Sequence, residues 1–186
     1  LGVQGGVEAW ITRNWFALFE MDRTFGTIGR GSSARTDYQR GTLKLGGGYK
    51  YLPLGFFYGP QVDFTLGLAR NSYRPEFEKA KGYGEFGING IFAGVGANLP
   101  VTREYRALVR AEFIPFPTFD NNDSVYGSNK SLSWLQLEGG VRYQYNPSTT
   151  LDALLEMTSA KASFRGDTKS VAAQDTSLKF GASFNF

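Results

Sequence analysis

Acidic and basic side chains recur at alternate positions of this sequence, and they are its first candidates for chemistry. Glu20 and Asp22 lie two residues apart, as do Arg110 and Glu112. Two neighbouring carboxylates can share the roles of general acid and general base. The chain has no histidine and no cysteine, which removes the commonest general base, the commonest metal ligand and every thiolate nucleophile. What remains is ion-pair chemistry, and its meaning depends on the elements that carry these side chains.

The elements that carry them alternate with a period of two residues, which is the pattern of β-strands. In residues 15–29, Phe19 and Met21 fall on one face, while Glu20 and Asp22 fall on the other. The same alternation predicts nine strands, in residues 1–13, 15–29, 43–51, 56–68, 84–99, 105–113, 135–145, 151–158 and 178–186. Within the fifth of these, the apolar residues change face, and a bulge near Gly90 would explain the change.

The predicted strands are joined by connections that are alternately short and long. Short turns fall near residues 13, 53, 101 and 147, and longer polar loops occupy about 30–38, 70–83, 118–130 and 166–175. This asymmetry is expected of a barrel that crosses an outer membrane. A soluble β-sandwich or lipocalin-like barrel would show the same period with its apolar face inward. Long strands, with Tyr and Trp residues near their ends, favour the membrane interpretation.

Composition agrees with one such domain spanning residues 1–186. No apolar run approaches the roughly 20 residues of a membrane helix, and the mean hydropathy is only −0.28. A membrane barrel has this character because half of its strand residues face a polar interior. The net charge of +3 is too small to indicate nucleic acid as a partner.

The end of the chain carries the most specific pattern. Leu178 and Phe180 alternate with Lys179 and Gly181, and the alternation continues to the final Phe186. Four of the terminal residues resemble the C-terminal assembly signal of bacterial outer-membrane β-barrels: Lys179, Gly181, Phe184 and Phe186. Together with the pattern of the whole chain, they make the protein similar to the small OmpA-like outer-membrane β-barrel family.

This resemblance implies an all-β, antiparallel transmembrane β-barrel of 8 to 10 strands, either complete or the C-terminal part of a larger barrel. It implies a bacterial outer-membrane location, with the C-terminus periplasmic and the long loops extracellular. It also implies that the barrel assembly machinery is a partner during biogenesis. Bacterial single-chain barrels have an even number of strands, whereas nine are predicted here. Two explanations stay open: a miscounted eight-stranded barrel, or ten or more strands with a strand or domain before Leu1.

The candidate site is the charged inner wall of this barrel. The predicted lumen charge network consists of Glu20, Asp22, Lys44, Asp63, Arg106, Arg110, Glu112, Glu138, Arg142, Glu156 and Lys179. Unpaired buried charge is costly, and a barrel of about eight strands has room only for side chains. The network then predicts a salt-bridged plug, in a non-enzymatic structural anchor or loop-presenting envelope protein. Ten or twelve strands would instead allow a narrow pore, or the barrel portion of a transport or export system.

No enzyme activity, cofactor or metal is expected. Outer-membrane lipases, acyltransferases, deacylases and omptin-type proteases resemble one another in needing an active-site histidine, which this chain lacks. Basic residues of the long loops predict contacts with outer-membrane lipid and with the phosphates of lipopolysaccharide. The candidates are Arg35, Arg74, Lys79, Lys81, Arg165 and Lys169. An envelope protein that binds the loops is a further expected partner.

Overall fold

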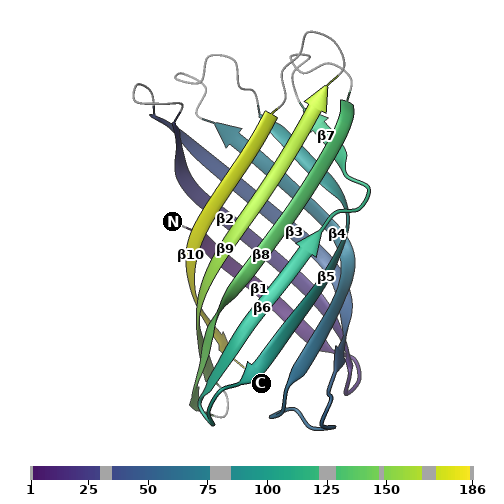
Figure 1. Cartoon of the computed structure of the whole chain (residues 1–186), viewed down its shortest axis with the longest axis vertical. Coiled ribbons are helices and arrows are strands. Elements are labelled where there is room, and N and C mark those ends of the chain that lie inside the picture. Colours follow the sequence, from purple (N-terminus) through teal and green to yellow (C-terminus); the bar gives the residue numbers. More distant parts are fainter. Residues whose placement is uncertain are drawn as a thin grey trace.

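The fold was determined as a computed structural model that describes residues 2–29, 35–75, 85–121, 129–146, 149–164 and 171–184. These residues form an all-β structure, a single antiparallel sheet curled until it is nearly closed into a barrel (Figure 1). The strands are β1 (Gly2–Trp10), β2 (Trp15–Gly29), β3 (Arg35–Tyr51), β4 (Gln61–Pro75), β5 (Phe86–Pro100), β6 (Tyr105–Phe113), β7 (Thr118–Asn121), β8 (Asn129–Asn146), β9 (Thr149–Phe164) and β10 (Val171–Phe184). Within the described residues, no helix has the length and apolar character needed to span a membrane.

Nine positions make up the wall formed by the described residues, in the order β1-β2-β3-β4-β5-β6-β8-β9-β10, and β7 pairs with β5. β6 and β7 occupy successive stretches of the same edge of β5. The four residues between them include Pro115 and Pro117, which have no N–H to donate to a ladder. The predicted loop over 118–130 is therefore wrong for Thr118–Asn121, which form a strand.

The two ends of the sheet meet at a seam between β1 and β10. Eight antiparallel pairings connect β1 to β10 along the sheet, and each pairing reverses the direction of the chain. An even number of reversals leaves β1 and β10 running the same way, and no backbone ladder joins them in the part of the chain that the structure describes. β1 is consequently exposed on both faces over almost its whole length.

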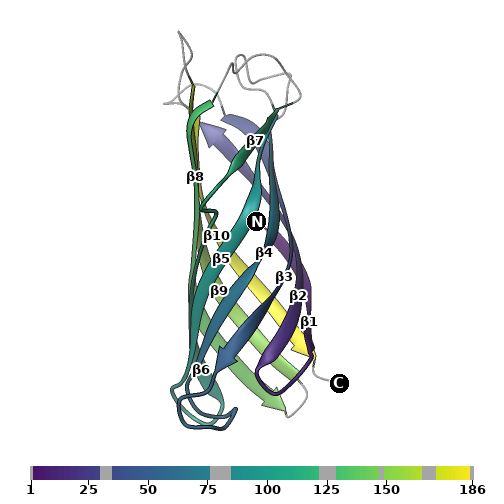
Figure 2. The same ribbon diagram turned by 90° about the vertical axis from the view of Figure 1, so that its right-hand side faces the viewer.

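The barrel is longer along its vertical axis than it is wide (Figure 2), and its two ends are distinguished by the connections that lie there. The connections formed by residues 11–14, 52–60 and 101–104 all lie at one end, here called the turn end (Figures 1 and 2). The opposite end, where β2 ends and β3 begins, is called the loop end. Residues 52–60 form turns, so the predicted fourth strand begins later than expected, and Pro60 directly precedes β4.

Several strands extend further toward the loop end than the sequence indicated. β3 begins at Arg35, β4 continues to Pro75 and β10 begins at Val171. The predicted loops over 30–38, 70–83 and 166–175 are therefore too long. The ends of β3 and β4 were missed because they carry polar residues on both faces, and the end of β10 was missed because Val171, Ala172 and Ala173 do not alternate with polar residues.

An apolar belt covers the outside of the barrel. Each of the nine wall strands contributes exposed apolar side chains to it, for example Val7, Phe19, Leu45, Leu66, Val95, Val109, Leu137, Leu155 and Phe180. The residues between them point inward, and many of those are charged and buried. This distribution is the reverse of that in a soluble barrel, which places its apolar side chains inside.

β5 departs from the sequence-based expectation. Its register with β4 is uninterrupted, so β5 does not change face at Gly90, and Phe86, Ile88 and Phe92 all point inward. The irregularity lies on the other edge of β5, where the pairing passes from β7 to β6 between Asn89 and Ala93. Gly90 serves a different purpose, because a Cβ atom added there would lie 2.7 Å from Cγ2 of the buried Ile114. The inner wall of β5 is thus apolar from Phe86 to Phe92, whereas the sequence predicted a polar interior.

Close packing inside the barrel depends on paired glycines in β3 and β4. Gly46 lies directly opposite Gly67. A Cβ atom on Gly67 would approach the carbonyl oxygen of Leu45 to 2.3 Å and Cε1 of Phe92 to 2.8 Å. The missing side chains therefore let the two strands and the Phe92 ring approach one another.

Replacing Gly67 with valine should lower the free energy of unfolding by about 1–3 kcal/mol, the usual cost of overpacking. Urea unfolding of the folded barrel would measure the change. Gly5→Val is the matched control, because no atom lies within 4 Å of a Cβ added at Gly5. Equal stability of the two variants would contradict this account of the inner wall.

Candidate functional site

Among the described residues, the largest ionic cluster is centred on the buried guanidinium group of Arg40. From β3, Arg40 pairs with Asp22 of β2 at 3.1 Å, with Glu156 of β9, and with Asp175 of β10 at 2.9 Å. It also donates a hydrogen bond of 2.6 Å to the hydroxyl of Thr158. One cation thus connects the two sides of the barrel that flank β1.

Lys179 completes this cluster from β10. Its ammonium group lies 2.8 Å from Oδ2 of Asp22 and 2.6 Å from Oε2 of Glu156. Gln136 of β8 donates a further hydrogen bond of 2.6 Å to the same Glu156 oxygen. Because Asp22 belongs to β2, the Lys179–Asp22 pair links β10 to β2 where β1 and β10 share no ladder. Side chains therefore hold the seam together.

A second cluster surrounds Lys44 near the middle of β3. Its buried ammonium group donates to Glu112 of β6, to Oε1 of Glu20 at 3.3 Å and to Oε1 of Gln136 at 3.2 Å. Arg110 lies 3.7 Å from Oε2 of Glu20 and 4.0 Å from Oε1 of Glu112. The two carboxylates share two cations, which lowers the cost of burying Lys44, Glu20 and Glu112.

Smaller groups of charges lie toward the turn end. Arg142 donates two hydrogen bonds, of 2.7 and 2.8 Å, to the two carboxylate oxygens of Asp152. This bidentate geometry gives the strongest pairing of arginine with a carboxylate. Lys50 lies 3.3 Å from Asp63 and 3.9 Å from Glu8.

The remaining predicted lumen residues are Arg106 and Glu138. The guanidinium group of Arg106 donates to the carbonyl oxygens of Tyr58 at 3.0 Å and Gly59 at 2.6 Å, so it fastens the turn formed by residues 52–60. Glu138 lies on β8, directly opposite Arg110 on one side and Glu156 on the other.

The interior also contains an aromatic stack, which was not predicted from the sequence. Tyr38 stacks on Tyr73 at a centroid distance of 6.2 Å, Tyr73 on Phe86 at 4.7 Å, and Phe86 on Phe119 at 5.7 Å. Trp134 is buried in the same apolar cluster. Three of the stacked residues lie in segments that were expected to be loops, which hid the stack. The period-two spacing of Phe86, Ile88 and Phe92 in β5 was the sequence feature that could have predicted an apolar inner wall here.

The ion pairs of both clusters join side chains from different strands and so stabilise the barrel. Glu156 accepts hydrogen bonds from Arg40, Lys179 and Gln136, so side chains of the wall already occupy its carboxylate oxygens. In the part of the chain that the structure describes, no group of three acidic side chains is arranged to hold a metal ion.

The remaining predicted residues are only partly within the described structure. Arg74 is exposed on β4 and pairs with Glu85 at 2.5 Å. Arg35 begins β3, and its side chain lies outside the described residues, as do Lys79, Lys81, Arg165 and Lys169. Of the predicted assembly signal, Lys179 is buried in the first ionic cluster and Gly181 is exposed. Phe184 ends β10, and Phe186 lies outside the described residues.

The chain matches no protein-family model, and a search of the curated proteins finds no match.

Proposed function

We propose that this protein is a non-enzymatic bacterial outer-membrane β-barrel, a structural anchor that presents its loops from a closed body. One observation carries the proposal: neighbouring residues of β3 have opposite environments. Lys44 points inward and is 0% exposed, whereas Leu45 points outward and is 61% exposed. In water, this arrangement would bury a charge and leave an apolar side chain solvated, both of which cost free energy. In a bilayer, Leu45 and the rest of the apolar belt would contact acyl chains.

Aromatic pairs at the turn end support the same proposal. Trp15 packs against Tyr49 at a centroid distance of 5.1 Å, and Tyr105 against Tyr143 at 5.0 Å. Trp and Tyr are enriched where a membrane meets water, because their rings are apolar and their tips are polar. The proposed orientation places the turn end and the C-terminus in the periplasm and the loop end outside the cell. The barrel assembly machinery would insert the chain, and an envelope protein partner would bind its loops.

The filled interior favours an anchor over the alternative of a narrow pore. Lys44, Glu112, Ile88 and Phe92 are all fully buried and come from three strands of the wall. Charged and apolar side chains together occupy the space through which a water path would have to pass. An export channel would need the same space.

Reconstitution into phosphatidylcholine vesicles, followed by planar-bilayer recording, tests the proposal. The folded chain should insert as a heat-modifiable barrel with protected strands, and it should show no steady conductance. A chain that stays in the aqueous phase would contradict the membrane location. Steady channels that disappear in Arg110→Gln, but persist in the turn-end control Arg103→Gln, would contradict the anchor and support the pore.

A further inference from the structure

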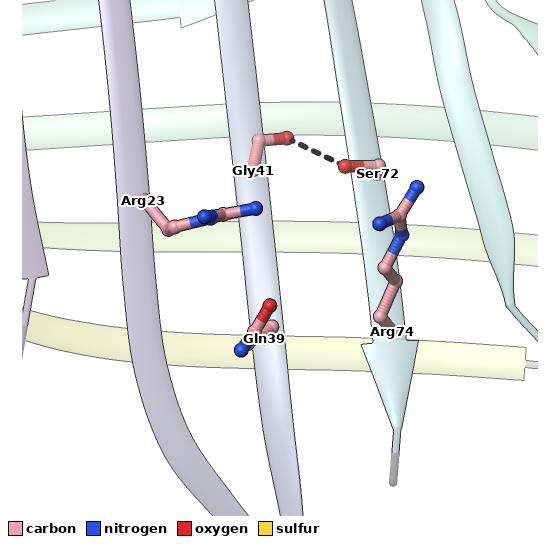
Figure 3. A pocket seen from close by; sticks show the side chains of 5 residues that line it. All are labelled: Arg23, Gln39, Gly41, Ser72 and Arg74. Atoms are coloured by element: carbon pink, nitrogen blue, oxygen red, sulfur yellow. Dashed lines mark hydrogen bonds between the residues drawn. The ribbon is translucent and has the colours of Figure 1, made fainter. Parts of the chain in front are cut away.

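A small hollow lies on the outer wall near the loop end, away from the charged interior (Figure 3). It has a volume of about 110 Å³ and is lined by Arg23, Gln39, Gly41, Ser72 and Arg74. The strand register explains how these residues meet. Arg23 of β2, Gly41 of β3 and Ser72 of β4 form one row across three strands, and Gln39 lies opposite Arg74 in the next row.

The hollow exists because its central residue has no side chain. A Cβ atom on Gly41 would lie 2.9 Å from Oγ of Ser72, and this hydroxyl donates to the Gly41 carbonyl oxygen at 3.3 Å. Arg23 extends from β2 toward β3, and Arg74 extends along β4 toward Ser72 (Figure 3). Two exposed guanidinium groups therefore flank a shallow floor of small residues.

The lining is a set of hydrogen-bond donors with excess positive charge. Arg23 and Arg74 supply forked N–H groups, and Gln39 and Ser72 supply neutral donors. Guanidinium groups match the geometry of phosphate oxygens and hold them with charge-assisted hydrogen bonds. The acidic group in contact is Glu85, which pairs with Arg74 at 2.5 Å. Asp37 lies one row further toward the loop end by register.

The position of the hollow identifies the source of such a phosphate. In the adjacent row, Met21 and Leu43 are exposed apolar side chains beside Arg70, and the row beyond that contains Leu45 and Leu68. The hollow thus lies at the loop-end border of the apolar belt, where Phe25, in the row of Gln39, is the last exposed apolar side chain of β2 among the described residues. In a bilayer, this is the level at which acyl chains give way to head groups.

We propose that the hollow around Gly41 binds a phosphate on the head group of lipopolysaccharide, with the acyl chains of that lipid lying along the apolar belt below it. This inference rests on the proposed outer-membrane location, and it assigns a binding site to the wall of that barrel. Charge complementarity selects an anionic ligand, and the adjoining apolar rows select one that carries acyl chains. Arg23 and Arg74 hold the phosphate, and Glu85 competes for Arg74.

Lipid retention by the purified barrel tests this site. Wild-type protein, folded in phosphatidylcholine vesicles, is titrated with purified lipopolysaccharide, and bound lipid is counted by native mass spectrometry. Arg23→Gln and Arg74→Gln should each weaken binding about tenfold, the scale of one hydrogen bond to a charged group. Gly41→Val should weaken it without changing the charge. Glu85→Gln should strengthen it, because Arg74 is released, whereas non-specific damage to the fold would weaken it. Arg103→Gln, which removes one positive charge at the turn end, is the control.

Each alternative result has a definite meaning. Equal lipopolysaccharide binding by all variants would overturn the site. Equally tight binding of phosphatidylglycerol, or full displacement by inorganic phosphate, would overturn lipopolysaccharide as the ligand. Heat-modifiable mobility in phosphatidylcholine alone separates these failures from failure of the proposed function. A wild-type chain that inserts but ignores lipopolysaccharide refutes the site alone, and a chain that never inserts refutes both.

Discussion

Replacing Lys44 with methionine is expected to lower the free energy of unfolding by about 3–5 kcal/mol, the cost of breaking a buried ion pair by removing one partner. Methionine keeps most of the length of the side chain but removes the charge that Glu20 and Glu112 share. Arg110, at 3.7 and 4.0 Å, would remain as the nearby cation of these two carboxylates. Urea unfolding of the vesicle-inserted barrel would measure the loss.

Two further variants show whether the loss comes from the ion pairs. Lys44→Met combined with Glu112→Gln removes both charges of the closest pair and should recover part of the stability, as a double-mutant cycle would reveal. Lys161→Met makes the same chemical change on the exposed face of β9 and should stay within about 0.5 kcal/mol of the parent. If Lys44→Met were as mild as Lys161→Met, the interior would be hydrated and the proposed plug would be wrong.

Placing an arginine at Leu66 should cost about 2–4 kcal/mol if the outer wall faces a bilayer, the cost of a basic residue near the midplane of a membrane barrel. Leu66 is an outward residue of β4 within the apolar belt and is 61% exposed. The arginine would have to leave water for acyl chains, and the expected loss is the cost of that transfer. Unfolding in vesicles, with wild type and variant compared at the same lipid composition, would measure it.

Val101 supplies a matched control for this experiment. It lies in the turn between β5 and β6 and is 68% exposed, close to the value for Leu66. A water-soluble barrel would treat the two substitutions alike, because both side chains would already be solvated. A membrane barrel would tolerate Val101→Arg, within about 0.5 kcal/mol, but would resist Leu66→Arg. Equal and small effects would argue that the apolar belt meets water or another protein.

Much of the fold could be predicted because strand geometry is local. Successive side chains of a strand point to opposite faces, whatever the strand packs against. The inward position of Glu20, Asp22 and Lys44 follows from that rule alone, and the structure buries all three. The same rule predicted nine alternating segments and the class of antiparallel barrel.

Other features could not be read from the alternation, since an inner wall accepts either charged or apolar side chains. The apolar residues of β5 looked like a change of face, because Phe86 and Ile88 alternate on one face and Ile91 and Val95 on the other. The structure shows one strand that is apolar on both faces in this stretch. The hollow at Gly41 was hidden because part of its lining was assigned to a loop. Its five residues become neighbours only when β2, β3 and β4 are aligned in register.

The sequence by itself determined that the chain alternates as strands do, that its inward faces carry charge, and that histidine and thiol chemistry are absent. Only the tertiary structure decided which charges meet. Arg40 and Glu156 are 116 positions apart in the chain, and Lys44 and Glu112 are 68 apart. Such partners are set by the curvature of the nearly closed wall and by the register of every strand between them. No local pattern encodes these distances, because each contact across the barrel depends on all of the pairings around it.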